Sequence, residues 1–308
     1  MFFPRVFLTG KSHVEYRRVL NTLFTRKALR YALPVLASSF TSSSFQSIYI
    51  SIQDTIARKH LNQWLVDAAK DASPKSIMKT ARELNMQTSL RVFCGNHIPE
   101  EGVTEISQKY WDITRALELV NFPLALPGTK VYKAIQARKV AFKWLEMAAA
   151  KSKIAIAEGA EPECMLEQWV KELQAPGYKG RKDFTDREMA MVVFSFLFAS
   201  QDAMSSGLIY GFQHLADHPE ILAKLREEQY RVRGNDVDKP LTLETLEEMP
   251  YLKAFVKESM RVKPPVIMVI PFTPFPWARL DSSFTRFLTR RRSHSPSLLN
   301  TRSLPAAW

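Results

Sequence analysis

The chain has 308 residues, 46% of them hydrophobic, and a formal net charge of +12. This apolar content suffices for the core of one large domain or two ordinary ones and excludes a disordered chain. Glycine is scarce, with 10 residues, which favours a mainly helical protein. Two cysteines, Cys94 and Cys164, exclude a disulfide framework and lack the Cys-x-x-Cys spacing of a zinc site, so we expect a reducing, intracellular setting.

The positive charge suggests acidic partners, such as nucleic acid, a phospholipid surface or an acidic protein face. It is unevenly distributed, because residues 271–308 contain six arginines, no lysine and one acid, Asp281. Five of the twelve charge units therefore belong to this segment, which is also rich in Ser, Pro and Leu. The basic balance consequently says less about the body of the protein, and we expect no nucleic-acid partner.

Helical patterns follow one another along the chain. The first begins at Ser12, where Glu15 completes a capping box, and a Ser-rich stretch at 37–45 breaks the pattern. The N-terminal residues before Ser12 are too short in their apolar part to make a convincing signal peptide or anchor. Further helices are expected at 54–71, 76–93, 100–119, 132–156, 162–173, 218–233 and 242–262, and a Pro- and Gly-containing loop at 121–130.

The longest apolar run extends from Met189 to Phe212 and follows a capping box formed by Thr185 and Glu188. Its one formal charge is Asp202. By length the run could span a membrane, but a carboxylate at the bilayer centre costs roughly 3 kcal/mol on insertion scales. Two other interpretations fit the pattern as well. The run could be the central helix of a large helical protein, passing a cavity, or a buried helix whose polar groups pair with neighbours.

Polar residues surround Asp202 in this run. Ser205 and Ser206 follow it by three and four residues, so we expect the three side chains to share roughly one helix face. Downstream, Glu258 and Arg261 stand three residues apart in "KESMR", just before a Pro-Pro break. As a bare motif this pair is most simply a surface ion pair, but its position 56 residues after Asp202 is informative.

Together these segments resemble the cytochrome P-450 haem-thiolate monooxygenases, over roughly residues 10–270. The stretch "MPYLKAFVKESMRVKPPV" is similar to the family's Glu-x-x-Arg helix. The stretches "FLFASQDAMSS", "EYRRVLNTLFTRKAL", "SIQDTIARKHLNQWL" and "PLALPGTKVYKAIQAR" resemble fungal sterol C-22 desaturases of ergosterol synthesis. The resemblance implies a mainly α-helical P-450-like domain at 1–270 that uses haem as cofactor, and a separate basic tail without regular structure at 271–308.

The resemblance also assigns roles to residues of the central run. Asp202 matches the acid implicated in proton delivery during oxygen activation. Ala203 stands where most relatives have a threonine, which leaves Ser205, Ser206 or water to assist and makes ordinary hydroxylation doubtful. Phe198, Ala199 and Gln201 are expected beside the haem or the sterol substrate, with Ala199 on the haem and the other two on the sterol.

Outside this run, the resemblance places His13 and Arg17 against a haem propionate, where a guanidinium offers a permanent charge in a forked geometry. Glu258 and Arg261 are expected to be structural, securing the haem-binding core. The family further implies a sterol substrate, electrons from an NADPH-cytochrome reductase, and a monomer at the endoplasmic reticulum membrane.

The cysteine ligand of the haem iron is not found where the family has it. After Arg261 the chain contains neither cysteine nor glycine, so the ligand loop, like the family's first sheet region, is expected to be missing and the chain inactive. The tail that follows is either a functional basic segment or an out-of-frame end of the reading frame, and its composition favours the second. The alternative from another class is a non-enzymatic helical protein with one membrane span at 189–212 and a basic cytosolic tail.

One short stretch resembles a metal-binding motif. His214 and His218 stand four residues apart in "HLADH", a spacing that can hold zinc on a helix. The stretch lacks the glutamate of His-Glu-x-x-His, and Pro219 interrupts the helix directly afterwards. Packing at a helix end is the favoured interpretation.

Overall fold

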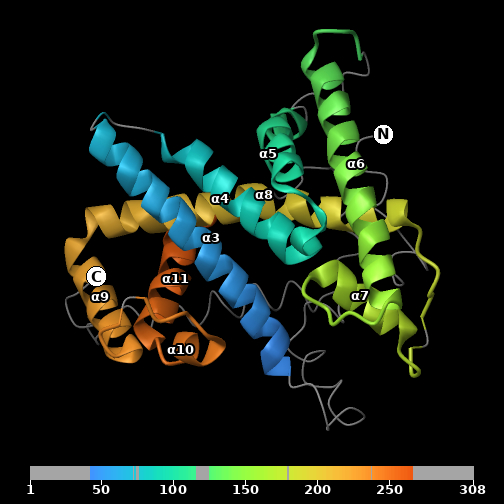
Figure 1. The fold of residues 1–308 in the computed structure, drawn as a ribbon. Coiled ribbons are helices and arrows are strands. Elements are labelled where there is room, and N and C mark those ends of the chain that lie inside the picture. Colours follow the sequence, from blue (N-terminus) through green and yellow to red (C-terminus); the bar gives the residue numbers. More distant parts are fainter. Residues whose placement is uncertain are drawn as a thin grey trace, which may run out of the picture.

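The computed structural model describes residues 42–71, 73, 76–115, 125–178, 180–236 and 238–265, and each regular element within them is a helix (Figure 1). In chain order these are α3 (Ser42–Lys70), α4 (Ile77–Cys94), the short 3-10 helix η1 (Gly95–His97), α5 (Glu100–Arg115), α6 (Lys130–Ala157), α7 (Met165–Gln174), α8 (Asp186–Asp217), α9 (Pro219–Arg233), α10 (Leu243–Glu247) and α11 (Pro250–Val262). The mainly α-helical class expected from the sequence is confirmed. His13, Arg17, the capping box of Ser12 and Glu15, and the 271–308 segment lie outside the described residues.

Helix α8 runs through the middle of the molecule, and the other helices are arranged around it (Figure 1). Its first half packs on α6 and α4, and its second half contacts α9 and α11. Helix α3 covers α4, while α5 and α7 pack on α6. A long helix that passes through a helical protein must be apolar around most of its circumference. This position therefore explains the apolar run of the sequence.

The N-terminus of α8 is fixed by the capping box that the sequence predicts. The Glu188 backbone N–H donates to the Thr185 hydroxyl over 3.2 Å, and the Glu188 carboxylate accepts from the Thr185 backbone N–H over 3.0 Å. Arg181 donates two further hydrogen bonds to the same carboxylate, over 3.0 and 2.9 Å. Two otherwise unsatisfied N-terminal groups gain partners in this way, so the start of the central helix is well defined.

Two expectations about helix boundaries are wrong. The segment 242–262 is divided into α10 and α11, because Pro250 cannot donate a backbone hydrogen bond and instead occupies the first turn of a new helix. The Ser-rich stretch does not end where expected, since α3 already begins at Ser42. Serine disfavours a helix only weakly, and the packing of α3 on α4 outweighs that preference.

Helices α9 and α11 share a small apolar core of their own, formed by Ile221, Leu225 and Phe255. The buried carboxylate of Glu228 on α9 accepts the backbone N–H groups of Tyr251 and Leu252, both over 2.8 Å. It thereby caps the N-terminus of α11, where a negative charge is favoured. The orientation of α11 is set from α9 through this contact.

Helix α8 is also long and apolar enough to cross a membrane, judged by length and composition. The alternative interpretation of the sequence depends on this property. In the structure, however, Met189, Ala190, Val193 and Leu197 of α8 are buried in the main core, beside residues of α4 and α6. The first half of the helix therefore has protein neighbours on its apolar side.

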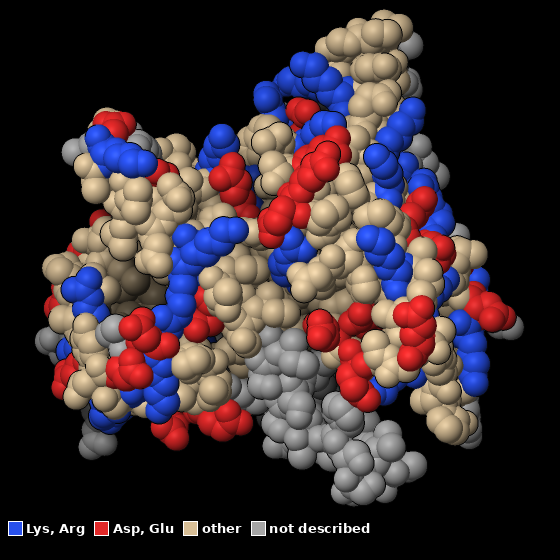
Figure 2. All heavy atoms as spheres, in the orientation of Figure 1, with Lys and Arg blue, Asp and Glu red and all other residues tan. Residues whose placement is uncertain are grey.

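Charged side chains of both signs are interspersed over the face seen in Figure 2, with basic side chains gathered along α6 and acidic ones nearby. This mixture agrees with the uneven charge of the sequence, in which residues 271–308 hold much of the net positive charge. The described body thus presents no continuous field of one sign on this face.

Both cysteines are buried in the main core. Burial raises the pKa of the Cys164 thiol to about 12 and that of Cys94 well above its ordinary value. Because only the thiolate is nucleophilic, we expect iodoacetamide to modify both thiols at least ~100-fold more slowly in the folded chain than in urea. Mass spectrometry of the time course measures the rates. The variant Asn62→Cys, on the exposed side of α3, is the control, and equal rates at all three thiols would contradict the buried positions.

Candidate functional site

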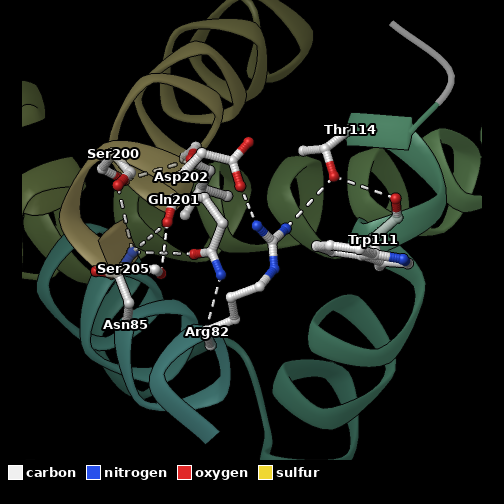
Figure 3. Close-up of polar contacts among 9 residues, drawn as sticks. Arg82, Asn85, Trp111, Thr114, Ser200, Gln201, Asp202 and Ser205 are labelled. Atoms are coloured by element: carbon white, nitrogen blue, oxygen red, sulfur yellow. Dashed lines mark hydrogen bonds and ion pairs between the residues drawn. The ribbon is translucent and has the colours of Figure 1, made fainter. Parts of the chain in front are cut away.

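The polar residues in the middle of α8 meet two polar residues of α4 (Figure 3). The Gln201 side-chain amide donates to the Arg82 backbone carbonyl over 2.8 Å, and the Asn85 amide donates to the Gln201 side-chain oxygen over 3.2 Å. Asn85 also reaches the backbone carbonyls of Ser200 and Gln201, over 3.3 and 3.2 Å. Since Gln201 is 2% exposed, its polar atoms find their partners inside the α4–α8 contact, as buried amides must.

Asp202 lies at the edge of this contact and pairs with Arg82. The guanidinium donates to the Asp202 carboxylate through Nη1 and to the Thr114 hydroxyl through Nη2, over 3.4 Å. Its carbon atom also lies 4.3 Å from the ring centroid of Trp111 on α5. The Arg82 side chain is nearly buried, whereas that of Asp202 is 52% exposed. The nearly buried guanidinium contacts Asp202, Thr114 and Trp111, and it thus holds the accessible carboxylate of Asp202 in place.

The polar residues of α8 divide between two faces, which differs from the single face expected. Ser205 is buried and donates to the Gln201 backbone carbonyl over 2.6 Å, so it lies one turn beyond Gln201, on the side of α4. Ser206, one turn beyond Asp202, is partly exposed. The division arises because successive residues of a helix are rotated by about 100°. Ser205 and Ser206 therefore point to opposite sides of Asp202, by roughly 60° and 40°.

Tyr110 is a further polar residue close to Asp202. It is 1% exposed, its ring lies 5.9 Å from that of Phe194, and its hydroxyl has no hydrogen-bond partner among the described residues. Burial raises the pKa of the phenol far above its ordinary value, the charge of Asp202 adds to this effect, and the charge of Arg82 opposes it. The phenol therefore keeps its proton. Nothing in the sequence pattern distinguishes Tyr110 from an ordinary aromatic core residue.

Phe198 and Ala199 lie beside the polar cluster on α8, where Phe198 is partly buried and Ala199 is exposed. Glu258 and Arg261 lie on α11 and bond to each other through two hydrogen bonds, of 2.8 and 2.6 Å. Their side chains are 36% and 70% exposed. Among the predicted site residues, Gln201 and Ser205 are hydrogen-bonded to each other, and so are Glu258 and Arg261. The second pair lies on α11, apart from Asp202 on α8.

A pocket lies at the N-terminal end of α8, away from the polar cluster. It has a volume of about 530 Å³ and is lined by Ile135, Arg138, Lys139, Phe142, Lys143, Glu146 and Arg187. Arg187 precedes Asp202 by 15 residues, which corresponds to roughly 22 Å along the helix. The pocket is therefore separate from the polar cluster.

The histidines of "HLADH" lie at the junction of α8 and α9. His218 is the residue between the two helices, and its Nδ1 is 3.3 Å from the carboxylate of Glu220. His214 and His218 belong to no group of three or more metal-ligating side chains among the described residues. The interpretation as helix-end residues fits this geometry.

Comparison with known protein families identifies relatives of this chain. The sequence model of the cytochrome P450 family matches residues 6–271. Among curated proteins, the chain is 38% identical over 283 residues to the C-22 sterol desaturase of Aspergillus fumigatus, covering 86% of this chain and 51% of that protein. It is 39% identical over 274 residues to the C-22 sterol desaturase of Candida albicans, covering 86% of this chain and 49% of that protein.

Solved structures show the same fold. A retinoic-acid-bound cyanobacterial P450, CYP120A1, superimposes with a TM-score of 0.60 and 22% sequence identity, covering 83% of this chain and 50% of that one. The chain spans about half the length of the curated relatives it matches. Because the family model matches most of the 308 residues, and the helices superimpose on those of a solved member, the chain belongs to the cytochrome P450 family.

Proposed function

We propose that the chain provides the central helix and its surroundings in a P450 that introduces the C-22 double bond into the side chain of a sterol. The observation that carries this proposal is the similarity to two fungal C-22 sterol desaturases, at 38% and 39% identity over 86% of the chain. The polar cluster around Asp202 supports it, because it places a fixed, accessible carboxylate midway along α8.

Haem is the cofactor of the family, and when it is bound through a cysteine thiolate it supplies oxygen activation. The donors in this chain do not fit a complete haem site. Cys94 and Cys164 are the two cysteines of the sequence, and both are buried in the main core among residues of α4 and α7. We therefore propose that these 308 residues do not catalyse the reaction by themselves.

Within a complete protein, the residues around Asp202 would have separate tasks. Asp202 would exchange protons with solvent at its exposed carboxylate, and Arg82 would hold that carboxylate in position. Ser206, rather than the buried Ser205, would be accessible for a hydrogen bond on the same side. Phe198 and Ala199 would contact sterol or haem.

The remaining expected site residues would act through structure or lie elsewhere. Gln201, whose amide is used between α4 and α8, would position the helix rather than touch the sterol. Glu258 and Arg261 would secure α11 in the complete fold, and His13 and Arg17 would meet a haem propionate. We further propose that the protein works as a monomer at the endoplasmic reticulum membrane, with electrons from an NADPH-cytochrome reductase.

A chimera tests the proposal. The part of the Aspergillus fumigatus desaturase from the position aligned with Val262 to its C-terminus is joined after Arg261 of this chain. The chimera should give the carbon-monoxide difference spectrum of a reduced haem thiolate, and fungal cells that lack C-22 desaturase should regain C-22-unsaturated sterols, measured by mass spectrometry. The 308-residue chain alone should give neither signal.

The variant Asp202→Asn in the chimera separates folding from chemistry. It should keep the thiolate spectrum but lose most of the sterol product, because the amide cannot supply a proton. A strong thiolate band from the chain alone would refute the proposed inactivity. A chimera with a normal thiolate band and no C-22-unsaturated sterol would refute the proposal that the reaction is C-22 desaturation of a sterol.

A further inference from the structure

Three side chains with metal-ligating atoms converge where η1 meets the start of α7, apart from the polar cluster around Asp202. They are His97, Cys164 and Glu167, and their donor atoms all lie within 4.8 Å of one another. His97 Nε2 is 2.7 Å from Glu167 Oε1. Cys164 and Glu167 are buried, and the His97 side chain is partly exposed. The cluster lies at the C-terminal end of α4, roughly 18 Å along that helix from Arg82.

The Glu167 carboxylate is already oriented. Its Oε2 accepts the backbone N–H groups of Glu163 and Cys164, over 2.7 and 3.2 Å. Its other oxygen, Oε1, is left to face His97. Fixing one oxygen by backbone donors and leaving the second toward other ligands is the outer-shell arrangement that orients carboxylates in metal sites.

The turn that carries His97 packs closely against Cys164 and is stabilised by Arg91. Gly95 has a φ of +58°, which favours glycine, and an added Cβ there would lie 3.1 Å from Cβ and 3.4 Å from Sγ of Cys164. Arg91 donates to the carbonyls of Gly95 and Ile98, over 3.1 and 2.6 Å, and pairs with Glu100. The nearby guanidinium is therefore engaged by the turn and by an acid of its own.

We propose that His97, Cys164 and Glu167 bind a thiophilic divalent cation, with zinc the preferred ion and water as its fourth ligand. One thiolate, one imidazole and one carboxylate are the donor types that zinc takes in proteins, whereas magnesium and calcium prefer oxygen alone. The charges balance, because a dication with a thiolate and a carboxylate leaves the buried site neutral.

Binding follows a defined proton balance. The Cys164 thiol releases one proton to solvent and becomes the thiolate ligand. In the free chain the His97 Nε2–H donates to Glu167, and on binding the imidazole shifts to the tautomer that carries this proton on Nδ1, so that the Nε2 lone pair faces the ion and no second proton is released. The ion replaces the His97–Glu167 hydrogen bond, and the partly exposed side of His97 provides its entry path.

The competing explanation is that the cluster serves only to anchor η1 on α7 through the His97–Glu167 hydrogen bond. The two explanations differ in zinc uptake. The chain is stripped with a chelator and titrated with zinc against a chromophoric competitor, and its zinc X-ray absorption spectrum is recorded. Haem content does not affect this readout. We expect one zinc ion per chain, with one sulfur and otherwise nitrogen or oxygen neighbours.

Matched variants identify the ligands. Cys164→Ser and His97→Gln should each weaken zinc binding by at least ~100-fold. Cys94→Ser and His60→Gln, which change a buried cysteine and a histidine that contacts Gln87 outside the cluster, should bind zinc as the unchanged chain does. Circular dichroism without zinc checks that each variant folds.

The unchanged chain alone can overturn the proposal. Absence of bound zinc, or a spectrum with no sulfur neighbour or with two, would show that this donor set does not form the site. Zinc should also raise the thermal unfolding midpoint of the unchanged chain and of Cys94→Ser, but not that of Cys164→Ser. A loss of binding in Cys94→Ser equal to that in Cys164→Ser would contradict the assignment as well.

Discussion

Replacing Trp169 with alanine should lower the free energy of unfolding by about 3 kcal/mol. Trp169 is fully buried in the main core, with its ring 5.3 Å from that of Phe184, so truncation leaves a large cavity between α7 and the start of α8. The expected loss lies at the low end for such changes because the indole N–H has no hydrogen-bond partner among the described residues, and its removal relieves a desolvation cost. Urea unfolding followed by circular dichroism measures the change.

Two variants control this prediction. Trp169→Phe keeps most of the ring and removes the N–H, so it should lose less than half as much stability as the alanine variant. Trp111→Ala removes a tryptophan that is 44% exposed and contacts Arg82, and should cost about 1 kcal/mol. Equal losses at Trp169 and Trp111 would contradict the position of Trp169 in the core.

Gln201→Leu should lower the free energy of unfolding by about 2 kcal/mol, since two buried hydrogen bonds are lost at about 1 kcal/mol each. The bonds are those from Gln201 to the Arg82 carbonyl and from Asn85 to the Gln201 side chain. A leucine of similar volume fills the space, so the loss reports the polar partners rather than a cavity. Thermal and urea unfolding of the purified variant measure the effect.

Gln213→Leu is the matched control, because Gln213 lies on the same helix and is exposed. Its amide oxygen accepts a hydrogen bond from Lys263 over 2.8 Å at the surface, and its loss should change stability by no more than ~0.5 kcal/mol. If Gln201→Leu lowered the free energy of unfolding as little as this control, the polar contact between α4 and α8 would not stabilise the fold as proposed.

Most of the fold could be predicted from local pattern. Capping residues and apolar spacing indicated α4, α6, α7, α8 and α9 to within a few residues, as at Thr185, where the predicted capping box is present. One of the two boundaries that were wrong, at Pro250, depended on whether a proline bends a helix or begins a new one. The Glu228 carboxylate decides this by capping α11 from a different helix, and such long-range contacts are not visible in the local sequence.

The candidate site was predictable only on its own helix. Asp202 was identified because a lone carboxylate in an apolar run is costly, but Arg82, its partner 120 residues earlier, follows an ordinary amphipathic pattern. The split of Ser205 from Asp202 depends on which side of α8 meets α4, which periodicity alone does not define. The same limit applies to Cys164 and His97, which are 67 residues apart in the sequence. They come close in space because the turn at Gly95 packs against Cys164.

The small core shared by α9 and α11 has a consequence for motion. It is distinct from the main core, and the two are connected through the second half of α8. Segments with separate cores can open locally at a lower free energy than global unfolding. The α9–α11 corner, which carries the Glu258–Arg261 pair, would therefore form a cooperative unit of its own, able to detach and re-dock while the helices around Trp169 stay folded.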